Sequence, residues 1–121
     1  MIQEGQLVLF RFPQTDQNLG KLRPALVLRK LPGPYDDWLV CMISSRLSQQ
    51  IQNFDELISE NDVDFESSGL RIASIIRIGR LAIVTRDILV GSIGNISSER
   101  LNIIKIRLSD LLRNTDDNET G

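Results

Sequence analysis

Histidine is absent from the 121-residue sequence, and Cys41 is its only cysteine. Histidine is the most common general base and metal ligand near neutral pH, so a serine-hydrolase triad and a structural zinc site both lack essential members. A single cysteine cannot form a disulfide within the chain, which favours a reducing compartment, and we expect a cytoplasmic protein. Any catalysis has to depend on other side chains.

The sequence also has no long apolar run and no strong charge of one sign. No stretch approaches the roughly 18–20 apolar residues of a membrane-spanning helix, and no basic-then-apolar leader opens the chain, so we expect neither membrane insertion nor secretion. The net charge is −2, from 14 Lys and Arg against 16 Asp and Glu. A protein that coats nucleic acid through bulk charge is far more basic, so a nucleic-acid site would have to be local.

The remaining composition is that of an ordinary globular protein, with 41% hydrophobic and 25% charged residues. A chain of this length favours one domain, which we assign to residues 1–113. The polar, acidic residues 114–121 are expected to form a disordered tail. Acidic pairs occur at 36–37 and at 62 and 64, but surface turns carry such pairs routinely, and we expect neither a metal nor another cofactor.

Short apolar stretches bounded by turn residues predict a mainly β protein. The first three predicted strands have short links and should form an antiparallel meander. The segment 55–58 fits either a strand or a helical turn, and we do not choose between them. The strands are expected at residues 6–12, 24–30, 38–43, 74–78, 81–85 and 88–93.

A single amphipathic helix is predicted at the end of the domain. Ser97 can cap its first turn, and apolar residues then recur at helical spacing up to about Arg113. The strands lie too close together in sequence to leave room for crossover helices, which excludes a parallel α/β sheet. The sequence therefore predicts a small, partly open barrel with a C-terminal helix.

The stretch 20–28 combines a glycine-led basic loop with an apolar strand. Pro24 pushes Arg23 out of the helical region, so Arg23 should lie extended at the entrance of the strand. In a meander, the start of the second strand and the end of the third share one edge, so Arg23 and Ser44 can face one small pocket. A guanidinium beside a hydroxyl suits a phosphate group. The plainer alternative is that the Arg23 stem covers apolar surface and Ser44 completes a turn.

The order of several motifs resembles the MazF/PemK family of toxin endoribonucleases. The resemblance extends over roughly residues 5–112. It is carried by residues 5–9 (GQLVL), 12–16 (FPQTD), 20–28 (GKLRPALVL) and 41–45 (CMISS), and more loosely by Gly69-Leu70, residues 74–77 (SIIR), Ile93-Gly94, Ser97 and the closing helix.

The resemblance implies a fold, an activity and partners. The fold would be the SH3-like barrel of the MazF/PemK/CcdB toxins, assembled as a homodimer. The activity would be metal-independent, sequence-selective cleavage of single-stranded RNA, in which the ribose 2′-hydroxyl attacks the adjacent phosphate and leaves a cyclic phosphate. The inhibitor would be a small antitoxin protein.

The resemblance also implies roles for individual residues. Arg23 matches the arginine that precedes proline in the family, and Ser44 falls where threonine is common, so these two would be catalytic. Gly79 stands where some members carry an aspartate proposed as the base, so the general base is unassigned. The alternative is a catalytically weakened RNA- or protein-binding module on the same barrel. The residues expected to bind RNA are Thr15, Lys21, Ser45, Arg46 and Arg77.

Overall fold

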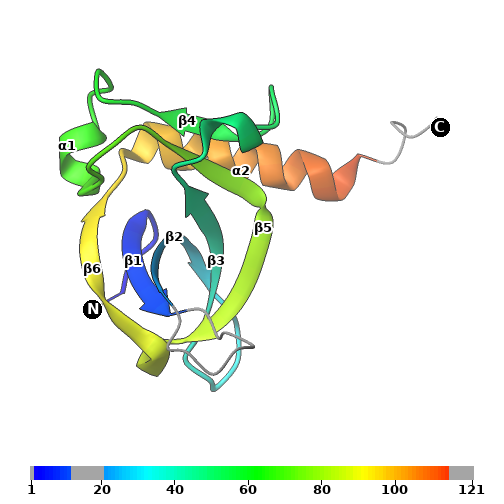
Figure 1. Cartoon of the computed structure of the whole chain (residues 1–121). Helices are drawn as coiled ribbons and strands as arrows, with labels where there is room; N and C mark the ends of the chain where they lie inside the picture. Colours follow the sequence, from blue (N-terminus) through cyan, green and yellow to red (C-terminus); the bar gives the residue numbers. More distant parts are fainter. Residues whose placement is uncertain (1, 12–20, 115–121) are drawn as a thin grey trace.

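The structure, a computed structural model, describes residues 2–11 and 21–114. Thr15 and the predicted tail beyond Asn114 lie outside the described residues. Six strands, two α-helices and two short 3-10 helices make up the described part of the chain (Figure 1). In chain order they are β1 (Gln6–Arg11), β2 (Leu22–Lys30), β3 (Asp37–Ser44), η1 (Leu47–Gln49), β4 (Glu56–Ile58), α1 (Phe65–Ser68), β5 (Ser74–Thr85), η2 (Arg86–Ile88), β6 (Leu89–Asn95) and α2 (Ser98–Arg113).

The six strands form one sheet in the order β4-β5-β3-β2-β1-β6, and each strand runs antiparallel to its neighbours. β4 and β6 are the two edge strands, and η2 joins β5 directly to β6, so the sheet curls into a partly open barrel (Figure 1). The predicted meander of the first three strands and the mainly β class are both confirmed.

The centre of the sheet is buried on both faces. On one face Leu26 and Cys41 belong to a core that packs against Ile104 of α2. On the other face Val27 and Val40 belong to a second core inside the curl of the sheet. The residues Ala25 to Leu28 alternate between the two cores, which explains why this stretch of β2 is continuously apolar.

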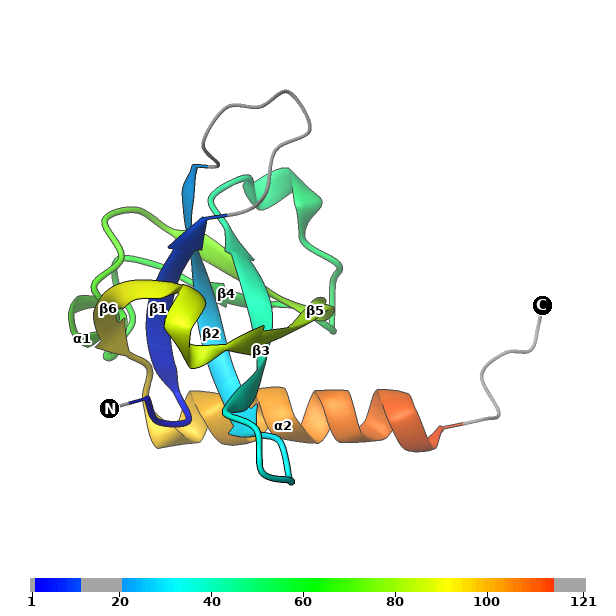
Figure 2. The same ribbon diagram turned by 90° about the horizontal axis from the view of Figure 1, so that it is seen from below.

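The C-terminal helix lies across one end of the barrel and extends beyond it (Figure 2). Ser97 caps it as predicted, because the Ser97 side chain accepts a hydrogen bond from the backbone N–H of Arg100 at 3.1 Å. The first half of the helix buries Ile104 completely. No helix in the described part of the chain has the length and apolar content needed to cross a membrane.

The predicted strands at 74–78 and 81–85 are a single long strand, β5, so their separation was wrong. The pairing with β3 jumps from Met42 opposite Arg77 to Cys41 opposite Leu81. The residues between Arg77 and Leu81 are therefore extra on the β5 side, as in a bulge. Gly79 lies in this irregular part, which made the strand look interrupted in the sequence.

Two further elements were not specified by the sequence pattern. Residues 56–58 form a strand, which settles the alternative left open above. The short helix α1 was not expected, and it lies directly against β6, because a Cβ at Gly94 would stand only 2.1 Å from the Ser67 carbonyl oxygen. Gly69, with φ of +79°, ends α1 in the left-handed region that favours glycine.

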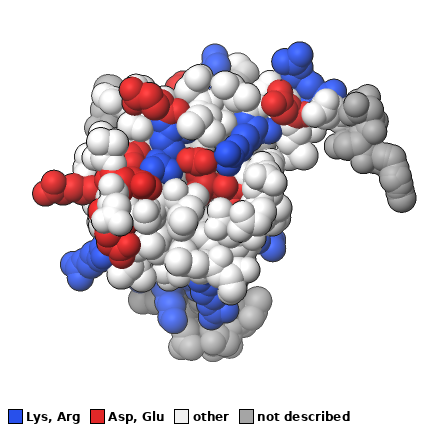
Figure 3. Space-filling model, turned by 90° about the horizontal axis from the view of Figure 1, so that it is seen from above, with Lys and Arg blue, Asp and Glu red and all other residues white. Residues whose placement is uncertain are grey.

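One arginine ties the segment 56–64 to α2. Arg100 donates hydrogen bonds to Glu56, Asp62 and Asp64 at 2.8–3.0 Å. Basic and acidic side chains are accordingly interleaved on the face that carries β4 and α2 (Figure 3). The acidic pair at 62 and 64 is thus part of an ion-pair cluster. The pair at 36–37 is also in a structural role, because Asp36 accepts from the Trp38 indole at 2.8 Å and pairs with Arg86.

Candidate active site

A cavity opens where β2 and β3 stop pairing. The ladder between them begins at Ala25 opposite Met42, directly after Pro24, which has no N–H to contribute. Arg23 and Ser44 each lie two residues beyond this first pair, on the two sides of the opening. The strands separate here, and a cavity of about 350 Å³ is left between them.

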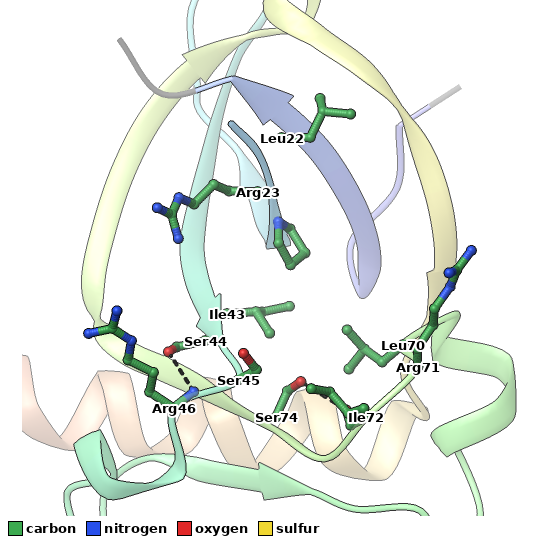
Figure 4. Close-up of a pocket in the computed structure, with 11 residues that line it drawn as sticks. Leu22, Arg23, Ile43, Ser44, Ser45, Arg46, Leu70, Arg71, Ile72 and Ser74 are labelled. Carbon is green, nitrogen blue, oxygen red and sulfur yellow. Dashed lines mark hydrogen bonds between the residues drawn. The ribbon is translucent and has the colours of Figure 1, made fainter. Parts of the chain in front are cut away.

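The lining of the cavity combines cations, hydroxyls and apolar surface (Figure 4). Arg23 and Arg46 lie on one side of the opening, and Arg71 lies on the other. Among the described residues, no carboxylate lines this cavity. The lining consists of Leu22, Arg23, Pro24, Ile43, Ser44, Ser45, Arg46, Leu70, Arg71, Ile72 and Ser74.

The side chains of the three arginines around the cavity are exposed. Within the part of the chain that the structure describes, the guanidinium groups of Arg23, Arg46 and Arg71 make no hydrogen bond or ion pair. Arg100, by contrast, gives all its donors to carboxylates and a carbonyl. Unpaired guanidinium groups beside a cavity without carboxylates are well suited to an anionic ligand, and to phosphate in particular.

Ser44 is held by two hydrogen bonds. Its Oγ donates to Gln49 Oε1 at 2.9 Å and accepts from the backbone N–H of Arg46 at 3.1 Å. Arg77 reaches the same Gln49 oxygen through Nη1 at 3.5 Å, and its buried Nε has no hydrogen-bond partner among the residues that the structure describes. The end of β3, the η1 turn and β5 therefore meet in one small polar network behind the cavity wall.

The predicted site residues divide into three groups. Arg23, Ser44, Ser45 and Arg46 line the same cavity, so the structure brings these four together. Arg77 lines a separate cavity of about 300 Å³ and touches this network only through Gln49. Lys21 is exposed ahead of β2 and is not among the lining residues of either cavity, while Thr15 lies outside the described residues.

Gly79, at the position of the missing aspartate, lies close to an aromatic ring. A Cβ added at Gly79 would lie 3.3 Å from Cε2 of Phe54. The nearby Asp55 is buried, and its carboxylate accepts from the backbone N–H groups of Ile51 at 2.9 Å and Ile78 at 3.1 Å. Asp55 therefore fastens the 51–55 turn to β5, and it does not lie at the cavity that contains Arg23.

Cys41 does not contribute a nucleophile. The thiol is fully buried in β3. Burial, with a smaller contribution from the charge of Asp55, raises its pKa to about 12. The thiolate is the reactive form of cysteine, so this side chain stays protonated and inert at neutral pH.

Two residues of the site were missed by sequence reasoning. Arg71 reaches the cavity from the loop between α1 and β5, which lies far from Arg23 in sequence. Gln49 lies in a polar segment without periodicity, and nothing in its local sequence distinguishes it from Gln50. Only the tertiary fold could have identified either residue.

Comparison with known protein families identifies the family of this chain. A family model described as a PemK-like, MazF-like toxin of type II toxin–antitoxin systems matches residues 3–112. The search of curated proteins gave no match. The matched range includes all six strands and every described residue of the cavity, and it confirms the resemblance drawn from the sequence.

Proposed function

We start from the fact that this chain belongs to the PemK-like, MazF-like toxins of type II toxin–antitoxin systems, and we propose that it cleaves single-stranded RNA. The family implies endoribonuclease activity and an antitoxin partner. The proposal adds three points: cleavage is sequence-selective, it needs no metal ion, and the RNA supplies its own nucleophile. A cytoplasmic location follows from this substrate and from a chain with one unpaired cysteine.

The observation that carries the proposal is a set of three arginines that have no partner among the described residues and that surround a cavity with serine hydroxyls in its lining. In the proposed reaction the ribose 2′-oxygen attacks the adjacent phosphorus. The new O2′–P bond forms as the P–O5′ bond breaks, the 2′ proton is lost, and the departing 5′ oxygen gains a proton. Negative charge grows on the phosphoryl oxygens, and the Arg23 fork stabilises it.

The single-stranded form of the substrate also fits the cavity. Its apolar part, which includes Ile43, Leu70 and Ile72, lies between Arg23 and Arg46 on one side and Arg71 on the other (Figure 4). An unpaired base can lie on an apolar surface while its flanking phosphates reach cations on both sides. Ser45 and Arg46 would then contact RNA directly. Lys21 and Arg77, which do not line the cavity, would contribute charge from its surroundings.

Purified protein should cut an RNA of mixed sequence at defined positions and leave 2′,3′-cyclic phosphate and 5′-hydroxyl ends. A matched oligonucleotide with 2′-deoxyribose only at the cut position should resist cleavage, because the nucleophile is gone. Activity should survive dialysis against EDTA, because the chain has no histidine and its one cysteine is buried. Mass spectrometry of both product ends identifies the end groups. The same cleavage assay, run on the deoxy-substituted oligonucleotide and after EDTA dialysis, tests the other two expectations.

The alternative function is a weakened RNA- or protein-binding module. It is favoured by one observation, the absence of a carboxylate from the described lining of the cavity. Under this alternative the protein would bind the RNA without cutting it. Cleavage of the deoxy-substituted oligonucleotide, or activity that EDTA removes and magnesium restores, would instead contradict the proposed chemistry.

We also propose that the protein is a homodimer, because the end of α2 carries exposed apolar residues beside an apolar cavity of about 420 Å³ that Leu28, Leu39, Leu108 and Leu112 line. Leu111 and Leu112 continue the stripe of Ile104 and Leu108 at the end of the helix that extends beyond the barrel (Figure 2). They remain 50% and 74% exposed, whereas Ile104 is fully buried. A second copy related by two-fold symmetry could cover this surface.

Light scattering at micromolar concentration should give twice the monomer mass. Leu112→Glu should produce a monomer, because a charge at this position cannot be buried in an apolar interface. Ile106→Glu is the matched control: Ile106 is 51% exposed and lies on the opposite face of the same helix. A wild-type monomer, or equal dissociation by both substitutions, would contradict the proposed interface.

A further inference from the structure

We propose that Gln49 is a positioning residue that turns the Ser44 hydroxyl so that a lone pair, and not the proton, faces the cavity. In that orientation Ser44 accepts a hydrogen bond from the attacking 2′-hydroxyl of the RNA. The inference rests on the proposed function and adds a residue and an atom-level role to it. It starts from the contacts of Gln49, which is half-buried in η1 and reaches back to the end of β3.

The amide of Gln49 can face its neighbours in only one way. The Arg77 guanidinium has donors and no acceptor, so the Gln49 atom that faces it at 3.5 Å must be the carbonyl oxygen Oε1. The same oxygen lies 2.9 Å from Ser44 Oγ. Since Oε1 only accepts, the proton of this hydrogen bond has to come from the Ser44 hydroxyl.

The other hydrogen bonds that the Ser44 hydroxyl can form follow from this constraint. A hydroxyl has one proton and two lone pairs. The proton points at Gln49, and one lone pair accepts from the Arg46 N–H at 3.1 Å. The second lone pair is left, and Ser44 lines the cavity. A lone pair repels a phosphate oxygen but accepts from a hydroxyl, so the partner that fits is the ribose 2′-hydroxyl.

Arg77 acts on Ser44 through Gln49. Arg77 is not among the residues that line the Arg23 cavity, and its buried Nε finds no partner within the described part of the chain. A cation behind the amide holds Oε1 in place and prevents the amide from turning its NH₂ group toward Ser44. The network therefore runs from Arg77 through Gln49 to Ser44, and each member fixes the orientation of the next.

The test compares two substitutions at Gln49 in single-turnover cleavage of one RNA. Gln49→Met keeps the length of the side chain and removes the acceptor, and the rate should fall about tenfold with little change in KM. Gln49→Glu keeps an acceptor facing both Ser44 and Arg77, and its rate should stay within about threefold of wild type. Gln50→Met, at the neighbouring half-buried glutamine, is the control and should cleave normally.

A double-mutant cycle separates positioning from a general disturbance of the η1 turn. In a Ser44→Ala background, Gln49→Met should cause no further loss of rate, because Gln49 acts only through the hydroxyl. Equal losses in both backgrounds, or a wild-type rate for Gln49→Met, would overturn the inference while leaving the proposed function intact.

A binding measurement decides the question even without cleavage. Wild type should bind RNA more tightly than the same oligonucleotide with one 2′-deoxyribose at the cut position, and Gln49→Met should lose this preference. Gln49→Met that retains the preference would overturn the role of Gln49. If the protein neither cuts nor binds RNA, the proposed function fails and the inference fails with it.

Discussion

Arg23→Ala is expected to lower kcat/KM for RNA cleavage by at least about a hundredfold, because it removes a preorganised donor from the developing phosphoryl charge. The fold should be unaffected. Arg23 is exposed, and its guanidinium has no partner within the described residues, so its removal leaves no group unsatisfied. The rate is measured on one RNA with a mapped cut, and the melting temperature is measured on the same preparation.

Two controls make this result specific to the site. Arg23→Lys should restore little activity, because an ammonium group is a point charge and cannot bind two phosphoryl oxygens as the planar fork does. Arg29→Ala removes an exposed arginine from the far end of the same strand, away from the cavity, and should cleave normally. Full activity in a folded Arg23→Ala protein would remove Arg23 from the mechanism.

Arg100→Met is expected to destabilise the protein by about 3 kcal/mol, which corresponds to a loss of roughly 1–2 M in the urea midpoint. Arg100 is only 12% exposed, and it donates to Glu56, Asp62 and Asp64. Its removal takes the guanidinium away from Asp62 and from the buried Asp64, while Glu56 keeps its ion pair with Arg107 at 3.0 Å. Lys105→Met is the matched control, because Lys105 and its partner Glu4 are each 40% exposed and such a pair contributes little.

The same cluster predicts how stability depends on pH. Burial alone would raise the pKa of Asp64, but hydrogen bonds from Arg100 and from the Ser97 N–H, with the Arg100 charge, lower it from 3.8 to about 2. A carboxyl whose pKa is lower in the folded state stabilises the fold above its unfolded pKa. This stabilisation should be complete above pH 4 and should disappear as the pH falls through 2. The stability difference between wild type and Arg100→Met should therefore narrow over that window, and a constant difference would contradict the assignment.

The local sequence was sufficient to predict structure where a residue determines the conformation of the backbone next to it. Pro24 forces the extended conformation of Arg23, and the buried run that follows it fixes β2 at the centre of the sheet. These two features, with the predicted meander, were enough to predict that Arg23 and Ser44 lie at the same edge of the sheet. The C-terminal helix could be predicted equally well, because the Ser97 cap and the spacing of the apolar residues are both local signals.

Long-range contacts could not be predicted in the same way. Arg100 finds partners 36 to 44 residues away, and Gln49 reaches Arg77 across 28 residues. Neither contact leaves a periodic trace in the sequence. Gly79 was misleading for a related reason: it resembles a break between strands, but β5 continues through it, close to the ring of Phe54.

The burial of β2 has a consequence for the thermodynamics of ligand binding. Immediately after Arg23, the strand is fixed by Pro24 and by four residues that are at most 2% exposed. The backbone under the arginine is therefore already ordered before a ligand arrives, and binding has to restrict only the side-chain torsions of Arg23, a cost of up to about 2 kcal/mol. A small conformational-entropy cost of this kind lets a weakly charged protein hold a flexible, unpaired polynucleotide with few contacts.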